Sequence, residues 1–146
     1  MSTMTTLIPA PRRSGVADVS DRLGGLLTNR RTVAQWWVDL TAELDNLASR
    51  LLVDSQESWR DLSNQISRDA PHMTSQLRRI EGEHEELQAE LLNVRLQAGD
   101  SAGDPSRMDA ISASVERLLH RLRRHQERTT AVLYDAYERD LGGESA

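Results

Sequence analysis

The chain has 146 residues, of which 38% are hydrophobic and 28% are charged, and this composition suits a single folded domain. Its formal net charge of -5 argues against a dedicated nucleic-acid binder, and no apolar run approaches the roughly 20 residues that span a membrane. The absence of cysteine excludes disulfides, thiolate metal sites and cysteine nucleophiles, and we expect a soluble cytoplasmic protein.

The N-terminal region divides into a tail and a short helix. Residues 1–16 contain Pro9, Pro11 and Gly15 without any hydrophobic period, which predicts a disordered tail. Residues 18–29 place apolar side chains on one side of a short helix. These are Val19, Leu23, Leu26 and Leu27. We expect residues 17–143 to form a single helical-bundle domain.

A long helix is predicted from about residue 30 to residue 68. Neither glycine nor proline interrupts it, and seam positions recur with a seven-residue repeat. These positions are Val33, Trp37, Leu40, Leu44, Leu47, Leu51, Ser58, Leu62 and Gln65 or Ile66. A competing signal lies at Asp54 and Glu57, which have the spacing of a capping box and would break the helix there. The unbroken repeat favours one helix.

Two further long helices follow. Pro71 suits the first turn of the second helix, which runs to about Ala98. A loop over residues 99–105 leads to Asp104 and Pro105, which fit the cap and first turn of the third helix. The third helix runs to about Leu141. The sequence therefore predicts an all-α fold: an antiparallel up-down bundle of three long helices plus a short N-terminal helix.

The charged flanks of the last two helices favour an antiparallel hairpin. An acidic run on the second helix faces a basic run on the third helix when the numbers of opposed residues sum to about 204. Glu83 then lies opposite Arg121, and Gln76 lies opposite Arg128. At the other end, we expect the N-terminal helix to fold back antiparallel over an apolar overhang, with Trp37 close to Tyr134 or Tyr137.

Two histidines occupy seam positions where leucine would be expected. The seam of the second long helix is Met73, Leu77, Ile80, His84, Leu87, Leu91, Val94 and Ala98. The seam of the third is Met108, Ile111, Val115, Leu118, Leu122, His125, Thr129, Val132 and Ala136. Burial of an imidazole without a partner is costly. The pair is therefore either a set of core imidazoles satisfied by carboxylates or water, or a metal or proton-transfer site.

A carboxylate from the first long helix would complete a candidate metal site. If the first two long helices turn near Ala70, Glu57 comes level with His84, while His125 lies about 6 Å away along the axis. Glu57, His84 and His125 then form an oxygen and two nitrogen ligands suited to a divalent transition metal.

Several segments of the chain carry a family resemblance. These are Ala70-Pro71, Gly82-Glu83-His84-Glu85-Glu86-Leu87, Leu122-Arg123-Arg124-His125-Gln126-Glu127 and the run from Ala136 to Gly143. Together with Trp36-Trp37, they make residues 30–143 resemble hemerythrin-like bacterial proteins. The resemblance implies an antiparallel helical bundle with a non-haem di-iron centre, held by several histidines and two carboxylates, that binds oxygen, senses it or handles iron.

This chain departs from the family pattern at its ligands. Where the family carries H-x-x-x-E, only Glu57 remains, and His84 and His125 lack the usual companion ligands four or five residues away. The resemblance therefore implies a degenerate or mononuclear site with iron, another divalent metal or no metal.

Two functions remain open from the sequence. One is weak metal or ligand binding, or sensing, by a hemerythrin-like bundle. The other is a cofactor-free bundle used for protein-protein interaction or homodimerisation. We do not expect an enzyme, because no set of nucleophile, base and orienting group is visible.

Overall fold

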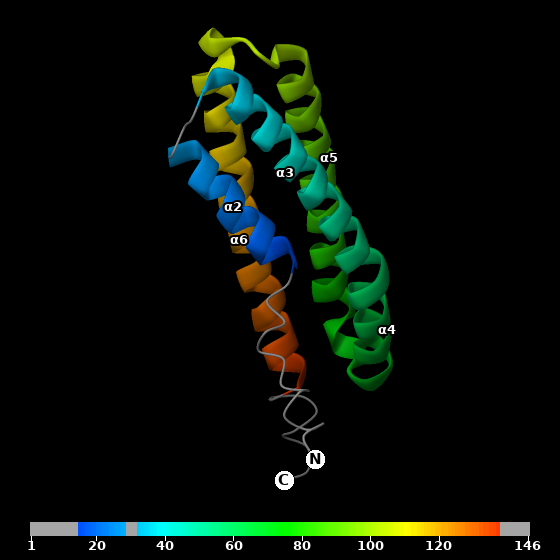
Figure 1. The fold of residues 1–146 in the computed structure, drawn as a ribbon. Coiled ribbons are helices and arrows are strands. Elements are labelled where there is room, and N and C mark those ends of the chain that lie inside the picture. Colours follow the sequence, from blue (N-terminus) through cyan, green and yellow to red (C-terminus); the bar gives the residue numbers. More distant parts are fainter. Residues whose placement is uncertain (1–14, 29–31, 138–146) are drawn as a thin grey trace, which may run out of the picture.

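The computed structural model of the protein describes residues 15–28 and 32–137. It is an all-α bundle (Figure 1). Its α-helices are α2 (Gly15–Thr28), α3 (Val33–Val53), α4 (Arg60–Asp69), α5 (Thr74–Ser101) and α6 (Met108–Tyr134). α3 and α4 run in one direction, α5 returns beside them, and α6 runs parallel to α3. The predicted up-down bundle of three long helices and a short N-terminal helix is confirmed.

The first long helix is continuous but changes its winding in the middle. Residues Asp54–Trp59 form a π-helical turn between α3 and α4. The capping box does not form, because Asp54 has helical dihedral angles and its N–H still donates to the carbonyl oxygens of Arg50 and Leu51. The wide turn accommodates one extra residue and therefore shifts the phase of the seam. Ser58, predicted on the seam, is exposed, whereas Trp59 is buried.

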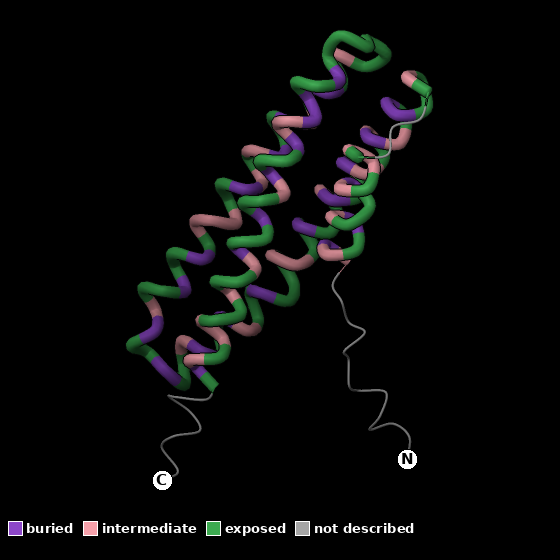
Figure 2. Tube along the Cα trace, turned by 90° about the vertical axis from the view of Figure 1, so that its left-hand side faces the viewer, coloured by how far each residue is buried: buried purple, intermediate pink, exposed green. Residues whose placement is uncertain are grey.

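The predicted seams of α5 and α6 form the core. Every α5 seam residue is buried except His84, which is half-buried, and on α6 only Thr129 and Val132 are less than fully buried. Figure 2 shows the buried positions recurring along the facing sides of the helices. The core has two parts, a larger one around Leu40, Leu91 and Val115 and a smaller one around Trp59 and Ile66.

The N-terminal helix folds back antiparallel to α3, as expected, and also contacts α6. It begins at Gly15, so the predicted tail boundary is too late: Val16, assigned to the tail, is 1% exposed. The rest of that tail, residues 1–14, lies outside the described residues. The indole nitrogen of Trp36 donates to the carbonyl oxygen of Leu26 at 3.1 Å, which fixes the end of α2 on the start of α3.

The expected contact of Trp37 with Tyr134 or Tyr137 is wrong. Trp37 is buried in the larger core cluster, which also contains Met108 at the start of α6, while Tyr134 at the end of α6 is 65% exposed. The reason is topological. Because α3 and α6 run parallel, the start of α3 lies beside the start of α6 and not beside its end.

The α5–α6 hairpin is antiparallel, but its register differs from the expected one by about one to two helical turns. Arg128 pairs with Glu83 instead of lying opposite Gln76. Arg121 pairs with Glu86 and Glu90 instead of Glu83. The predicted start of the third helix is confirmed, because Asp104 caps the turn at Pro105–Arg107 by accepting a hydrogen bond from the Ser106 N–H.

None of the helices in residues 15–28 and 32–137 is both long and apolar enough to cross a bilayer.

Candidate functional site

The observed register brings the two seam histidines together. His84 on α5 and His125 on α6 have ring centroids 4.6 Å apart and ring planes inclined at 68°. The offset of one turn expected from the sequence is removed by the register shift of the hairpin. The two imidazoles therefore form a pair in the interior of the bundle.

His125 is fixed by a carboxylate. It is 4% exposed, and its Nδ1 lies 2.7 Å from Oε1 of Glu83 on α5. The Nε of Arg128 donates to the same carboxylate, at 2.9 Å from Oε2. Burial alone would raise the pKa of Glu83, but the hydrogen bonds from His125 and Arg128 outweigh it and lower that pKa. Glu83 is therefore ionised at neutral pH and holds the imidazole in one orientation.

The second ring nitrogen of His125 lies on the side of Thr129. The Thr129 hydroxyl donates to the backbone carbonyl of His125 at 3.0 Å, and its oxygen is 3.5 Å from Nε2. When Nδ1 carries the proton donated to Glu83, neutral His125 has an unprotonated Nε2. In that tautomer the lone pair of Nε2 can coordinate a metal ion.

His84 has a different environment. It is half-buried, and its ring meets the edge of Trp59 at a centroid distance of 5.5 Å. No hydrogen bond to His84 is formed by any residue in the described part of the chain. The pKa of His84 is lowered from 6.5 to about 4, chiefly by burial and also by the adjacent His125, while the charge of Glu83 opposes the change. His84 is therefore a neutral imidazole at pH 7.

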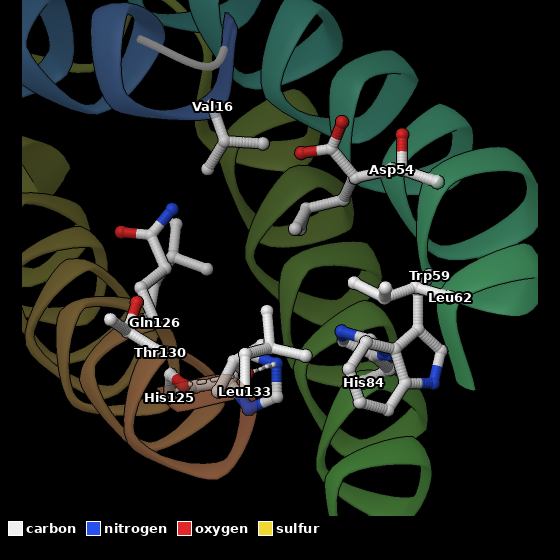
Figure 3. Close-up of a pocket in the computed structure, with 13 residues that line it drawn as sticks. Val16, Asp54, Trp59, Leu62, His84, His125, Gln126, Thr130 and Leu133 are labelled. Atoms are coloured by element: carbon white, nitrogen blue, oxygen red, sulfur yellow. Dashed lines mark hydrogen bonds between the residues drawn. The ribbon is translucent and has the colours of Figure 1, made fainter. Parts of the chain in front are cut away.

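Both histidines line a cavity of about 390 Å³ between the helices (Figure 3). The apolar lining residues are Val16, Leu51, Trp59, Leu62, Leu122 and Leu133. The polar lining residues are Asp54, Ser58, His84, His125, Gln126, Thr129 and Thr130. A cavity of this size, with mostly apolar walls and a few converging polar groups, has the character of a small-ligand site.

Two of the three predicted site residues lie at the cavity and the third does not. His84 and His125 come together at the cavity, whereas Glu57 is exposed on the π-helical turn and does not line it. The carboxylate that does line the cavity is Asp54, from the start of the same turn. Burial raises the pKa of Asp54, and the charge of Arg50 offsets part of that rise.

Three residues of the site were missed by sequence reasoning. Glu83 was assigned to the charged flank, although it directly precedes His84 and follows the seam residue Ile80 by three residues. Asp54 was considered only as a helix cap. Trp59 was passed over because the seven-residue repeat selected its neighbour Ser58; the large apolar side chain beside a serine on the seam was the available signal.

The residues at the cavity do not fit a di-iron centre. Within residues 15–28 and 32–137, no group of three or more histidine, aspartate and glutamate side chains is arranged to hold a metal ion. Such a centre needs several imidazoles and bridging carboxylates, and this cavity supplies two imidazoles.

Comparison with known proteins does not assign the chain to a family. Its sequence matches no family model, and neither the curated proteins nor the solved structures give a match.

Proposed function

We propose that this bundle binds a single divalent transition-metal ion between His84 and His125, with solvent or a small ligand in the remaining coordination positions. The observation that carries the proposal is the ring-to-ring placement of the two imidazoles beside a cavity. Imidazole nitrogen is a ligand for zinc, copper, iron and nickel. Two protein ligands imply weak binding, which suits sensing or transient loading better than a permanent cofactor.

The surroundings of each imidazole support this proposal. Histidine ligands commonly donate their second ring N–H to a carboxylate, and Glu83 accepts such a bond from Nδ1 of His125. A ligand must also be unprotonated, and the lowered pKa of His84 keeps its ring neutral at pH 7. Both conditions are met before any ion binds, so little reorganisation of these side chains is required.

Metal titration tests the proposal. We expect zinc or cobalt(II) to bind the wild type with a stoichiometry of one in calorimetry. The affinity should be at least tenfold lower in His84→Ala and in His125→Ala. His120→Ala is the matched control, because His120 is an exposed histidine on the same helix as His125. Glu57→Gln should also leave the affinity unchanged. Equal affinity in wild type and in both cavity variants would contradict the proposal.

A second candidate function is association with another protein or with a second copy of the chain. It is favoured by exposed aliphatic side chains on the neighbouring helices α3 and α5, at Leu52, Val53, Leu92 and Leu96, which are 43 to 60% exposed. Large aliphatic side chains exposed to this degree are often part of an interaction site. Sedimentation of the wild type and of a Leu92→Asp, Leu96→Asp double variant tests it: association should weaken in the variant.

A further inference from the structure

We propose that the cavity beside the histidine pair also binds a small organic cation, an amine with an aromatic or branched hydrocarbon body, whose ammonium group pairs with Asp54. This inference goes beyond the metal proposal and does not depend on it, because it needs neither a metal ion nor the two imidazole ligands. Its basis is the placement of one carboxylate in an otherwise mostly apolar cavity.

Asp54 lacks a close partner. It is half-buried, yet no described residue donates a hydrogen bond to its carboxylate or forms an ion pair with it. Arg50 influences Asp54 through its charge and does not form a hydrogen bond with it. The Arg50 side chain instead lies against Gly15, where an added Cβ would meet its Cδ at 2.7 Å. An unpaired, partly buried carboxylate is unfavourable, and a cationic ligand would relieve that cost.

The charge of the residues that line the cavity favours a cation over an anion. Among the cavity-lining residues that the structure describes, Asp54 is the one aspartate or glutamate, and neither lysine nor arginine is present. His84 is neutral at pH 7, so it contributes no positive charge. The carboxylate of Asp54 therefore presents a negative charge to a ligand, and it would repel an anionic molecule of the same shape.

The rest of the cavity defines the body of the ligand. Asp54 and His125 lie on opposite sides of the cavity in Figure 3, and the cavity is lined by apolar side chains from the four α-helices α2, α3, α4 and α6 and by Trp59 of the π-helical turn. The volume of about 390 Å³ is near the lower end for small-molecule sites, which suits a compact molecule with one ring. Trp59 lines the cavity, and an indole side chain can pack against a ring or an ammonium group.

Three probes of one shape and different charge test the inference. Benzylamine is cationic at pH 7, benzyl alcohol is neutral and benzoate is anionic. Each is titrated into the full-length protein in the presence of a chelator, with binding followed by chemical shifts of backbone amides at the cavity. We expect benzylamine to bind at least about tenfold more tightly than benzyl alcohol, and benzoate to bind most weakly.

The variant Asp54→Asn keeps the size of the side chain and removes its charge. It should reduce the preference for benzylamine over benzyl alcohol to less than about threefold, while benzyl alcohol binds as before. Glu57→Gln is the matched control, because Glu57 is an exposed carboxylate on the same π-helical turn. Asp54→Ser is a second test if the asparagine variant is unstable.

The inference is overturned if benzylamine binds wild type no more tightly than benzyl alcohol, if it gives no shifts at the cavity, or if Glu57→Gln reduces binding as much as Asp54→Asn. These outcomes are distinct from failure of the metal proposal, since the chelator removes metal from every titration. Zinc binding that depends on His84 and His125 would still support the metal proposal if benzylamine failed to bind.

Discussion

Replacing His84 with leucine should make the stability of the bundle less sensitive to mild acid. The ring has a pKa of 6.5 when free of the fold and about 4 within it, chiefly because burial disfavours the charged imidazole. Between these two values the unfolded chain binds more protons than the folded chain. The free energy of unfolding therefore falls as the pH drops from about 6.5 toward about 4.

The size of this effect follows from the width of that window. One pKa unit corresponds to about 1.4 kcal/mol. If the unfolded chain binds one more proton than the folded chain from about pH 6.5 to about pH 5, the free energy of unfolding falls by roughly 2 kcal/mol over that interval. His84 is only half-buried, so solvent screens part of its charge, and we expect about 1 kcal/mol. Stopping near pH 5 keeps Glu83 out of the measurement, because its pKa is lowered from 4.5 and its protonation reduces stability only below that value.

The assay is urea unfolding of wild type and His84→Leu at about pH 7.5 and about pH 5, with a chelator present. Wild type should lose about 1 kcal/mol more than the variant over this interval. The variant should be at least as stable as wild type at the lower pH, because leucine fills the seam and needs no proton. Equal losses in the two proteins would refute the assignment of His84 as a buried neutral imidazole.

Three other substitutions test the packing and the site. His125→Leu should destabilise the fold by about 1.5 to 3 kcal/mol in urea unfolding, because it removes a hydrogen bond to the Glu83 carboxylate, whereas the exposed His120→Leu should change stability by less than about 0.5 kcal/mol. Trp59→Ala should cost about 3 to 5 kcal/mol and Ser58→Ala almost nothing, and the reverse order would show that the π-helical turn is wrong. Leu23→Ala should cost about 2 to 5 kcal/mol in thermal or urea unfolding if α2 packs into the core, and no loss would mean that α2 is dispensable.

The helices could be predicted because one pattern repeats many times. Each long helix has eight or nine seam positions at alternating three- and four-residue steps, and Pro71, Asp104 and Pro105 mark boundaries between the helices. Errors occurred where the pattern is degenerate. The acidic run of α5 and the basic run of α6 satisfy each other in several registers one turn apart, so surface charge alone did not select the register that pairs Arg128 with Glu83.

The candidate site was predictable in part for the same reason. His84 and His125 were found because each replaces an apolar residue on a seam, and this signal survives an error in register. The carboxylates were not found, because their positions depend on the register of the hairpin for Glu83 and on the winding of the turn for Asp54. A single extra residue accommodated in the turn buries Trp59 and places Asp54 at the cavity, whereas Glu57 is exposed.

The most direct measurement of the central proposal is ¹⁵N NMR of the histidine rings during titration with zinc. We predict that the resonances of Nε2 of His125 and of one nitrogen of His84 shift together and saturate at one equivalent, while Nδ1 of His125 keeps its proton and its bond to Glu83. The rings of His72 and His120, both exposed, should not respond over the same range. Shifts confined to His72 and His120, or no shift in the two cavity rings, would contradict the proposed metal site.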